Sequence, residues 1–300
     1  MSIVLAGKPL VDTMVDDILT QKQELRWDTD RYLAIIFVWD DSASTAYVRL
    51  KQKMGQRTQI PVEVFGQDEQ SWFTDLKERK QKDFTSLDTI LDTIHFCNED
   101  DRCLGILVQL PLPEHLWEHV HTIMQSIRPS KDVDALAGTV YGMDALGIVD
   151  FLGATPQAAM TLLEHYKLKD MAGKTVSVLW QSNLTGKPLA THCMKLGATV
   201  HSFNKDSDQN EMKQRCQQSD YIFSCTGQVH LVDTSFINPT RKQVIVDIGY
   251  GYKDGRPVWD VDIESIKDMV HAYTPVPGGV WPLTVVSIFA NIIKLSRYFS

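Results

Sequence analysis

Short apolar runs of strand length, separated by segments with helical periodicity, constrain the fold of this chain more than any other feature. Residues 32–38 (YLAIIFV), 62–65 and 104–109 (LGILVQ) are such runs. Continuous apolar runs are typical of strands buried on both faces of a parallel sheet. The helices between and before them are expected at about residues 10–25, 42–57, 70–79 and 86–98. The first half of the chain is therefore predicted to be an α/β domain.

A second alternating set follows a connecting segment at residues 147–156. Its strands are expected at residues 175–180, 199–203, 221–225 and 244–248. The loop at 181–187 (QSNLTGK) leads into a helix that starts near Pro188, and dinucleotide-binding folds hold a pyrophosphate where a strand end meets a helix N-terminus. The second half therefore predicts a Rossmann-like domain. The last apolar helix, at about 283–295, is expected to return to the first domain.

Size and charge limit the classes of function. The chain has 300 residues and a mass of 34.0 kDa, which is enough for two domains with separate cores. The net charge of −8 and the scattered Lys and Arg residues argue against binding to nucleic acid. No window approaches the roughly 20 apolar residues of a membrane helix, and the N-terminal apolar run is too short for a signal peptide. We expect no nucleic-acid or membrane partner.

The cysteines predict a reducing compartment. There are five of them, an odd number, and none has the CxxC spacing of a metal site. Reduced, mostly structural thiols are the simplest interpretation, and they favour the cytoplasm. We expect no bound metal.

Two segments in the first half carry candidate catalytic side chains. Tyr47 and Lys51 are four residues apart, so on a helix they share a face and the Tyr hydroxyl can position the Lys amine. On spacing alone, an exposed helix with a solvated Lys51 is the simpler interpretation. Gln109 favours the functional one, because it ends a buried strand, and α/β proteins place functional side chains at the carboxyl ends of strands.

Two carboxylates, Asp132 and Asp134, lie in the loop-like sequence PSKDVDAL. One interpretation is a capped or solvated turn. The other is a carboxylate that accepts hydrogen bonds from the ring nitrogen and amino group of a heterocycle, much as a carboxylate pairs with guanidinium. The sequence pattern leaves both open.

Five strings, in order over nearly the whole chain, resemble one family. They are ASTAYVRLKQK (43–53), GILVQLPLP (105–113), KDVD (131–134), TGKPLA (185–190) and TPVPGGVWPLT (274–284). Together they resemble the bifunctional methylenetetrahydrofolate dehydrogenase/methenyltetrahydrofolate cyclohydrolases. The resemblance implies oxidation of 5,10-methylenetetrahydrofolate with NADP, or with NAD as the other candidate, and hydrolysis of the product to 10-formyltetrahydrofolate.

The resemblance also implies an organisation. Residues 1–149 and 281–300 are expected to form an α/β folate-binding catalytic domain, and residues 150–280 a Rossmann-like NAD(P)-binding domain, with a cleft between them. A homodimer is expected from the family alone.

Roles can be assigned residue by residue from the same resemblance. Lys51 is the expected central catalytic residue, tuned by Gln109 and positioned by Tyr47, which also stacks near the folate. Asp134 is expected to bind the pterin edge. Pro275, Gly278 and Gly279 are expected to line the substrate. The cofactor side is expected to comprise Thr155, Trp180, Gln181, Ser182, Lys205, Tyr250 and Thr284.

The cofactor loop departs from the family pattern. The family's GRS is Trp180-Gln181-Ser182 here, and the missing Arg is the natural partner of the 2′-phosphate that distinguishes NADP from NAD. Lys205, just beyond the second Rossmann strand, is the candidate substitute. Tyr250 stands where the family has an Ile near the nicotinamide.

Four tryptophans stand where the family motifs have Gly: Trp39, Trp180, Trp259 and Trp281. A Trp ring provides neither the φ > 0 freedom nor the close backbone approach of Gly. We hypothesise that these positions are UGA codons read as Gly by the organism and written as Trp in the conceptual translation. UGG codons at all four would refute this. The alternative is a divergent paralogue with an occluded dinucleotide site.

Three other functions compete with the bifunctional enzyme. The first is a cyclohydrolase with a degenerate dinucleotide site, since Tyr47, Lys51, Gln109 and Asp134 are all present. The second is a non-catalytic folate-binding or subunit-pairing protein that has kept the fold, which the presence of Lys51 disfavours. The third is a nicotinamide dehydrogenase for another substrate, which does not explain QLPLP and KDVD.

Overall fold

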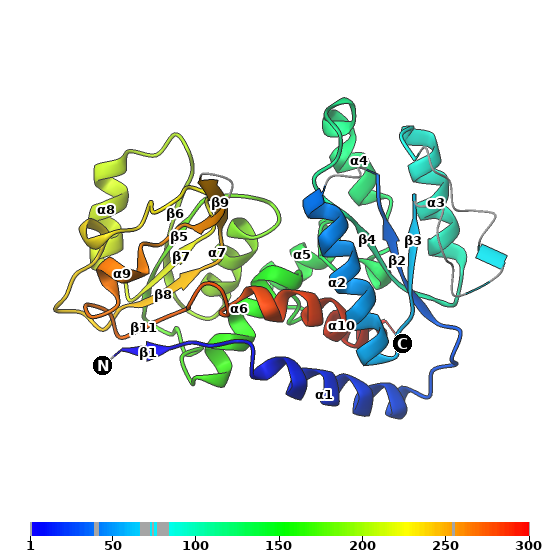
Figure 1. Ribbon diagram of the computed structural model, residues 1–300, viewed down its shortest axis with the longest axis horizontal. Coiled ribbons are helices and arrows are strands. Elements are labelled where there is room, and N and C mark those ends of the chain that lie inside the picture. The colour runs from blue at the N-terminus through cyan, green and yellow to red at the C-terminus, as the bar shows by residue number, and fades with distance from the viewer. Residues whose placement is uncertain are drawn as a thin grey trace. The chain divides into compact units, whose positions relative to one another are not determined.

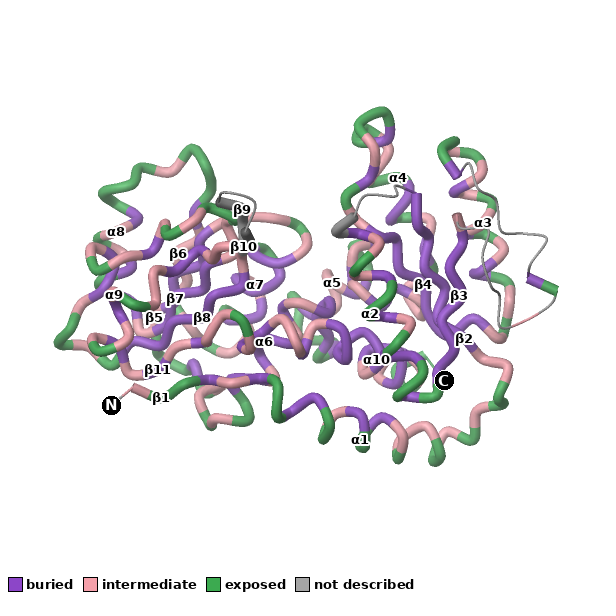
Figure 2. Tube along the Cα trace, viewed as in Figure 1, coloured by how far each residue is buried: buried purple, intermediate pink, exposed green. Residues whose placement is uncertain are grey.

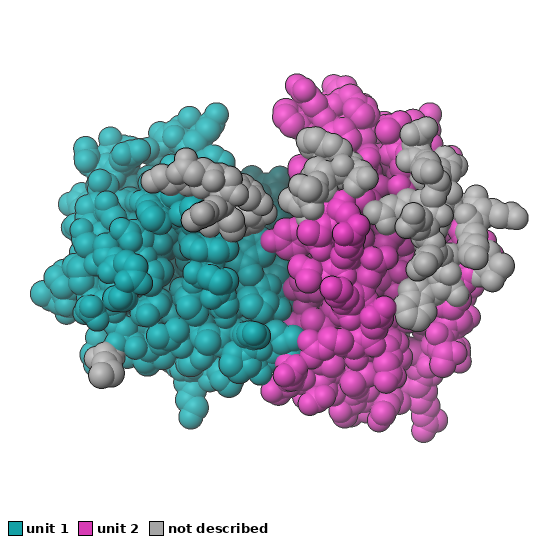
Figure 3. Space-filling view, in the orientation of Figure 1, with its two compact units in different colours: residues 1–11, 143–284 teal, residues 12–142, 285–300 magenta. Residues whose placement is uncertain are grey.

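The computed structural model describes residues 2–38, 42–66, 73, 75–76, 84–253 and 256–299; of residues 42–43, 250–253 and 256–257 it describes the backbone only. The chain divides into two compact units. Unit 1 comprises residues 1–11 and 143–284, and unit 2 comprises residues 12–142 and 285–300 (Figure 3). Each is an α/β unit with its own sheet (Figure 1).

The sheet of unit 2 has three parallel strands in the order β3-β2-β4. Every residue of these strands is buried (Figure 2), which confirms that the apolar runs are interior strands. They are β2 (Tyr32–Ile36), β3 (Val62–Phe65) and β4 (Cys103–Val108). The core packs Tyr32, Ile36 and Phe65 against Ile90 and Ile94 of helix α3.

The helices of unit 2 follow the predicted periodicity closely. Helix α3 begins after the N-cap Ser86, whose side chain accepts a hydrogen bond from the Thr89 amide. The helix expected at residues 70–79 lies largely outside the described residues. The helices wholly in unit 2 include α2 (Ser42–Thr58), α3 (Leu87–Glu99), η2 (Glu114–His119), α4 (Val120–Gln125) and η3 (Pro129–Lys131). Three more, α1 (Leu10–Leu25), α5 (Thr139–Ala145) and α10 (Trp281–Tyr298), cross between the two units.

The main sheet of unit 1 has the strand order β1-β11-β8-β7-β5-β6 and is parallel throughout. The chain builds outward from β5 in both directions, which is the doubly wound arrangement expected of a Rossmann-like domain. Its strands are β1 (Ile3–Val4), β5 (Thr175–Leu179), β6 (Thr199–Phe203), β7 (Tyr221–Ser224), β8 (Val244–Asp247) and β11 (Ala272–Tyr273).

Helices cover both faces of this sheet, α8 and α9 on one side and α6 and α7 on the other (Figure 1). The core on the α8 and α9 side includes Met212 and Cys216 of α8 and Ile266 of α9. The remaining elements of unit 1 are α6 (Ala154–His165), α7 (Gly186–Lys195), α8 (Gln209–Gln218), η4 (Thr234–Phe236), α9 (Ile263–Ile266) and the antiparallel pair β9 (Tyr250–Lys253) and β10 (Arg256–Trp259).

The N-terminal strand was not predicted from the sequence. β1 pairs with β11 through Ile3 and Ala272, so residues 1–11 group with unit 1, as do residues 143–149 and 281–284. The predicted functional boundaries differ from these compact units at those three segments. The first difference arises because a two-residue strand has no detectable alternation in the sequence. No described helix is long and apolar enough to span a membrane.

Candidate active site

A buried lysine bonded to a neutral amide forms the centre of the candidate site in unit 2. Lys51 lies on α2 and is only 7% exposed. Its Nζ donates a hydrogen bond of 2.6 Å to Oε1 of Gln109. Gln109 is the first residue after β4, and its own Nε2 donates to the carbonyl oxygen of Leu110 at 2.7 Å. The two contacts fix both ends of the Gln109 amide, so its oxygen faces Lys51.

Burial makes Lys51 chemically unusual. Desolvation lowers the pKa of its ammonium group from 10.5 to about 8, and the negative charge of Asp134 opposes this shift. The partner at hydrogen-bonding distance is an amide rather than a carboxylate. Lys51 can therefore lose and regain a proton near neutral pH, as a general acid or base requires.

Tyr47 and Asp134 complete the predicted group, and both are half-buried. Tyr47 precedes Lys51 by one turn of α2, so the two side chains share a face as predicted. Asp134 lies in the loop after η3 and acts on Lys51 electrostatically. The four predicted residues Tyr47, Lys51, Gln109 and Asp134 all belong to unit 2.

The neighbouring Asp132 has a structural place. It is 1% exposed and its carboxylate accepts hydrogen bonds from the amides of Leu136 (3.1 Å) and Ala137 (2.8 Å). Burial raises its pKa to about 6, although these hydrogen bonds oppose the rise. The capped-turn interpretation thus describes Asp132, which holds the loop that carries Asp134.

Four of the predicted cofactor residues, Trp180, Gln181, Ser182 and Lys205, follow the carboxyl ends of β5 and β6. These strands pair in parallel up to Leu179 and Phe203, so the residues that follow each lie at one edge. Gln181 spans the two ends, because its Nε2 donates to the Ser202 carbonyl oxygen (3.0 Å) and its Oε1 accepts from Asn204 Nδ2 (3.3 Å). Lys205 follows and is exposed.

The loop between β5 and α7 brings a helix N-terminus to the same edge. Ser182 Oγ accepts hydrogen bonds from the amides of Thr185 (3.2 Å) and Gly186 (3.3 Å). A Cβ atom on Gly186 would lie 1.7 Å from the carbonyl oxygen of Trp180, so the loop closes tightly only with Gly there. Amide groups and the positive end of α7 suit this edge to a phosphate.

Trp180 has a backbone conformation that favours Gly. Its φ angle is +94°, and L residues with bulky side chains adopt this region only under strain. Trp259 and Trp281 do not show positive φ, and Trp39 lies outside the described residues. The backbone thus supports a Gly requirement at one of the four positions.

The remaining predicted residues are also placed in unit 1. Gly278 has φ +115°, and its carbonyl oxygen accepts from the Gly7 amide at 2.8 Å. A Cβ atom on Gly279 would lie 2.8 Å from the Pro275 carbonyl oxygen, so the segment turns back on itself. Thr155 is half-buried in α6, and the buried Oγ1 of Thr284 has no hydrogen-bond partner among the described residues. The Tyr250 backbone lies in β9; its side chain is not described.

Comparison with known proteins relates both units to the two domains of one family. Residues 5–134 match the family model "Tetrahydrofolate dehydrogenase/cyclohydrolase, catalytic domain", and residues 153–299 match its "NAD(P)-binding domain". A "Bifunctional protein FolD" of Halalkalibacterium halodurans is 32% identical over 300 residues, covering 99% of both chains. Another from Acetivibrio thermocellus is 32% identical over 98% of this chain and 96% of the relative.

The chain belongs to the tetrahydrofolate dehydrogenase/cyclohydrolase family. A solved structure of the bifunctional FolD enzyme from Campylobacter jejuni superposes with a TM-score of 0.86, at 30% identity and 99% coverage of both chains. The chain is thus an α/β enzyme that combines a methylenetetrahydrofolate dehydrogenase with a methenyltetrahydrofolate cyclohydrolase. Tyr47, Lys51, Gln109 and Asp134 fall within the matched catalytic domain, and the predicted cofactor residues fall within the NAD(P)-binding domain.

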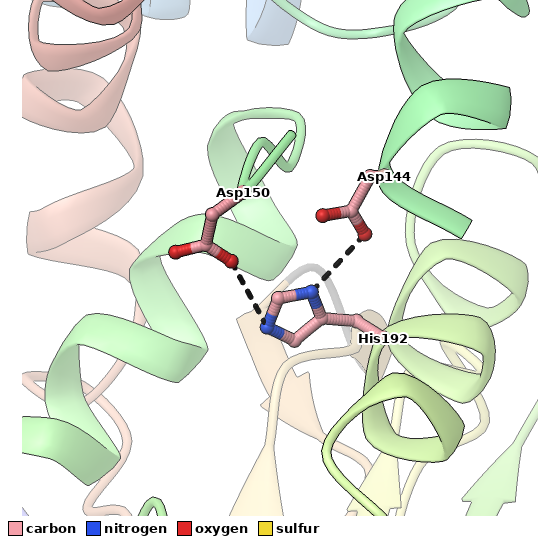
Figure 4. A group of neighbouring side chains, drawn as sticks. All are labelled: Asp144, Asp150 and His192. Carbon is pink, nitrogen blue, oxygen red and sulfur yellow. Dashed lines mark hydrogen bonds and ion pairs between the residues drawn. The ribbon is translucent and has the colours of Figure 1, made fainter. Parts of the chain in front are cut away.

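Sequence reasoning missed a buried ionic cluster in unit 1 of this family member. Asp144 is fully buried and its carboxylate accepts from His192 Nδ1 (3.1 Å) and Lys195 Nζ (2.6 Å). Figure 4 shows His192 between Asp144 and Asp150. The three could form a metal group, but the Lys195 ammonium also donates to Asp150 at 3.1 Å and so supplies the positive charge there. No spacing rule links residue 144 with residues 192 and 195.

Proposed function

We propose that Lys51 serves both reactions of this enzyme, with Gln109, Tyr47 and Asp134 as its supporting residues. The observation that carries the proposal is the buried 2.6 Å contact between Lys51 Nζ and the neutral amide oxygen Oε1 of Gln109. Burial lowers the pKa of this ammonium group to about 8. In the first reaction, the 5,10-methylene carbon loses a hydride to the dinucleotide and becomes a methenyl cation. With a pKa of about 8, Lys51 is mainly an ammonium at neutral pH, and loss of its proton gives the neutral amine, which adds no repulsive positive charge next to that cation.

The same amine fits the hydrolysis. Water adds to the methenyl carbon, its released proton passes to Lys51, and cleavage of one carbon–nitrogen bond leaves 10-formyltetrahydrofolate. The Lys51 ammonium can then return a proton to the departing ring nitrogen. Asp134 would pair with the pterin edge, and Tyr47 would hold the amine and stack near the folate.

We propose NADP as the dinucleotide. When bound, NADP supplies the hydride acceptor, and the residues after β5 and β6 are suited to hold it. The α7 N-terminus and Ser182 would face the pyrophosphate, and the exposed Lys205 would face the 2′-phosphate. A cyclohydrolase without dehydrogenase activity is not favoured, because an NAD(P)-binding domain spans residues 153–299.

We propose the functional division that the sequence predicts, with the folate side on residues 1–149 and 281–300 and the dinucleotide side on residues 150–280. Pro275, Gly278 and Gly279, which belong to residues 150–280, would also line the folate. We also propose a homodimer in the cytoplasm. The five free thiols, four of them buried, support a reducing compartment, and sedimentation of the purified chain tests the dimer.

The decisive experiment compares Lys51→Met with Lys53→Met, an exposed lysine on the same helix. Nicotinamide absorbance with NADP and with NAD follows the oxidation, and loss of methenyl absorbance follows the hydrolysis. Lys51→Met is expected to lower hydrolysis by a factor of about 10² to 10⁴, the usual contribution of general acid–base catalysis. Lys53→Met should stay within about twofold. Equal effects of the two substitutions would contradict the role of Lys51.

A further inference from the structure

Two fully buried aspartates at the dinucleotide edge of unit 1 have no role in the chemistry described above. Asp247 is the last residue of β8, and Asp260 follows β10; both are 0% exposed. One oxygen of each, Oδ1, is buried without a hydrogen-bond partner among the described residues. A buried carboxylate oxygen without a donor is costly, so this pair needs an explanation.

The second oxygen of Asp260 binds the end of β7. Its Oδ2 accepts from Ser224 Oγ (2.9 Å), the Thr226 amide (2.6 Å) and Thr226 Oγ1 (2.9 Å). The loop after β8 packs on the same carboxyl group, since a Cβ atom on Gly249 would lie 2.2 Å from Asp260 Oδ2. Asp260 therefore holds the residues that follow two neighbouring strands.

Asp247 connects the same region to β11. Its Oδ2 accepts from the Val261 amide at 3.0 Å, and its backbone amide donates to Thr274 Oγ1 at 2.8 Å. Thr274 begins the turn at residues 274–279. The two aspartates together contact the carboxyl ends of β7, β8 and β11.

The hydrogen bonds indicate where a proton resides. Asp260 Oδ2 accepts three bonds of 2.6–2.9 Å, two of them from hydroxyl groups, as an ionised carboxylate does. The donors to the Asp247 side chain are backbone amides, with the Val261 amide at 3.0 Å. Burial, and then the charge of Asp260, raise the pKa of Asp247 well above 3.8; burial also raises the pKa of Asp260, which its donors oppose. The negative charges of both carboxyl groups raise the pKa of the half-buried Cys225 thiol beyond the effect of burial.

We propose that Asp247 and Asp260 share one proton, held mainly by Asp247, and act as a positioning pair for the dinucleotide edge. The sheet order places β7 beside β5 where the chain reverses direction, and doubly wound sheets bind nucleotides outside the strand ends at that point. The pair keeps the loops after β7 and β8 in place for the nicotinamide half of the cofactor. This inference rests on the proposed use of that edge by NADP.

Asn substitutions separate the two members. In Asp247→Asn the side-chain amide supplies an N–H where the proton was, so the KM for NADP should stay within about twofold of wild type. In Asp260→Asn the charged acceptor is lost, and the KM for NADP should rise about tenfold or more with a smaller change in kcat. Methenyl hydrolysis should stay within about twofold in both. Asp262→Asn, a half-buried neighbour outside the pair, is the control.

Two measurements do not require a bound cofactor. The infrared carbonyl band of a protonated carboxylic acid should appear in wild type at neutral pH and vanish in Asp247→Asn. Because the folded-state pKa of Asp247 is raised, wild type should lose stability as pH rises from 3.8 toward that higher value. Asp247→Asn should lack that loss.

Several outcomes would overturn the inference. These are equal rises of the NADP KM in both Asn variants, no protonated carboxyl band in wild type, or parallel losses of oxidation and hydrolysis in Asp260→Asn, which would indicate a merely structural role. Absence of NADP reduction in wild type would instead refute the proposed cofactor role, while the infrared band would still report the shared proton.

Discussion

Lys51 and Asp144 are both buried ionisable side chains, but Lys51 is bonded to a neutral amide and Asp144 to basic side chains. Lys51 in unit 2 faces a neutral amide, and burial lowers the pKa of its ammonium toward neutrality. Burial alone would raise the pKa of Asp144 in unit 1, but hydrogen bonds from His192 and Lys195 lower it overall. A buried group with cationic partners stays in one charge state and stabilises structure. A buried group without a counter-ion at bonding distance can exchange a proton at a physiological pH.

The largest stability effect is expected from removing the carboxylate with charged partners. Asp144→Ala removes the buried acceptor of His192 Nδ1 and the shortest ion pair of the partly buried Lys195, which keeps Asp150 and the Val149 carbonyl oxygen as acceptors. Breaking such a pair by removing one partner costs about 3–5 kcal/mol. Urea denaturation at neutral pH measures the loss.

Asp150→Ala is the control, because Asp150 is 58% exposed on the rim of the same cluster. A surface ion pair contributes about 0–1 kcal/mol. Similar losses in the two variants would remove the distinction between the buried and exposed parts of the cluster.

A smaller effect of opposite sign is expected at Lys51. Lowering its pKa from 10.5 to about 8 corresponds to roughly 3 kcal/mol of unfavourable burial of the charge, which Lys51→Met removes. The substitution also leaves the Gln109 oxygen without its donor, which costs about 1–2 kcal/mol. The variant should therefore be about 1–2 kcal/mol more stable than wild type at pH 7.

The sign of the pH dependence sharpens this prediction. Between pH 8 and pH 10.5 the unfolded chain binds the Lys51 proton more tightly than the folded one, so wild type gains stability as pH rises through that window. The advantage of Lys51→Met in thermal unfolding should shrink over the same range. Lys53→Met should show no such trend, and an advantage that is constant with pH would contradict a buried charged lysine.

The smallest effect is expected at Trp180. A Gly at this positive φ removes backbone strain and a bulky ring from the dinucleotide edge. Trp180→Gly should lower the KM for NADP at least threefold, equivalent to about 0.7 kcal/mol, and leave methenyl hydrolysis unchanged. Trp117→Gly, an exposed tryptophan in η2, should not change the KM. A UGG codon at position 180 would refute the recoding hypothesis there.

Much of the candidate site could be predicted because its parts are local in sequence. Tyr47 and Lys51 share one helix, and Gln109 directly follows a strand whose apolar run is unmistakable. The five sequence strings, in their order along the chain, predicted the family, and the comparisons confirm it. The individual roles of the site residues stay predictions.

The buried polar groups could not be predicted in the same way. The carboxylate of Asp144 meets side chains 48 and 51 residues later, and Asp260 binds Ser224 across 36 residues. In both cases the contact follows from which strands and helices become neighbours. Nothing in the local pattern distinguishes these aspartates from solvated ones.

The two alternating α/β halves, and the helix and strand limits near Lys51 and Gln109, could be predicted from the sequence alone, because periodicity and local hydrogen bonding act over a few residues. The family could be predicted from it as well. Which charges are buried, the contact of Lys51 with an amide, the strand that residues 1–11 add to the second sheet, and the positive φ of Trp180 became known from the folded chain. Those outcomes depend on desolvation and on partners distant in the chain, which a local pattern does not encode.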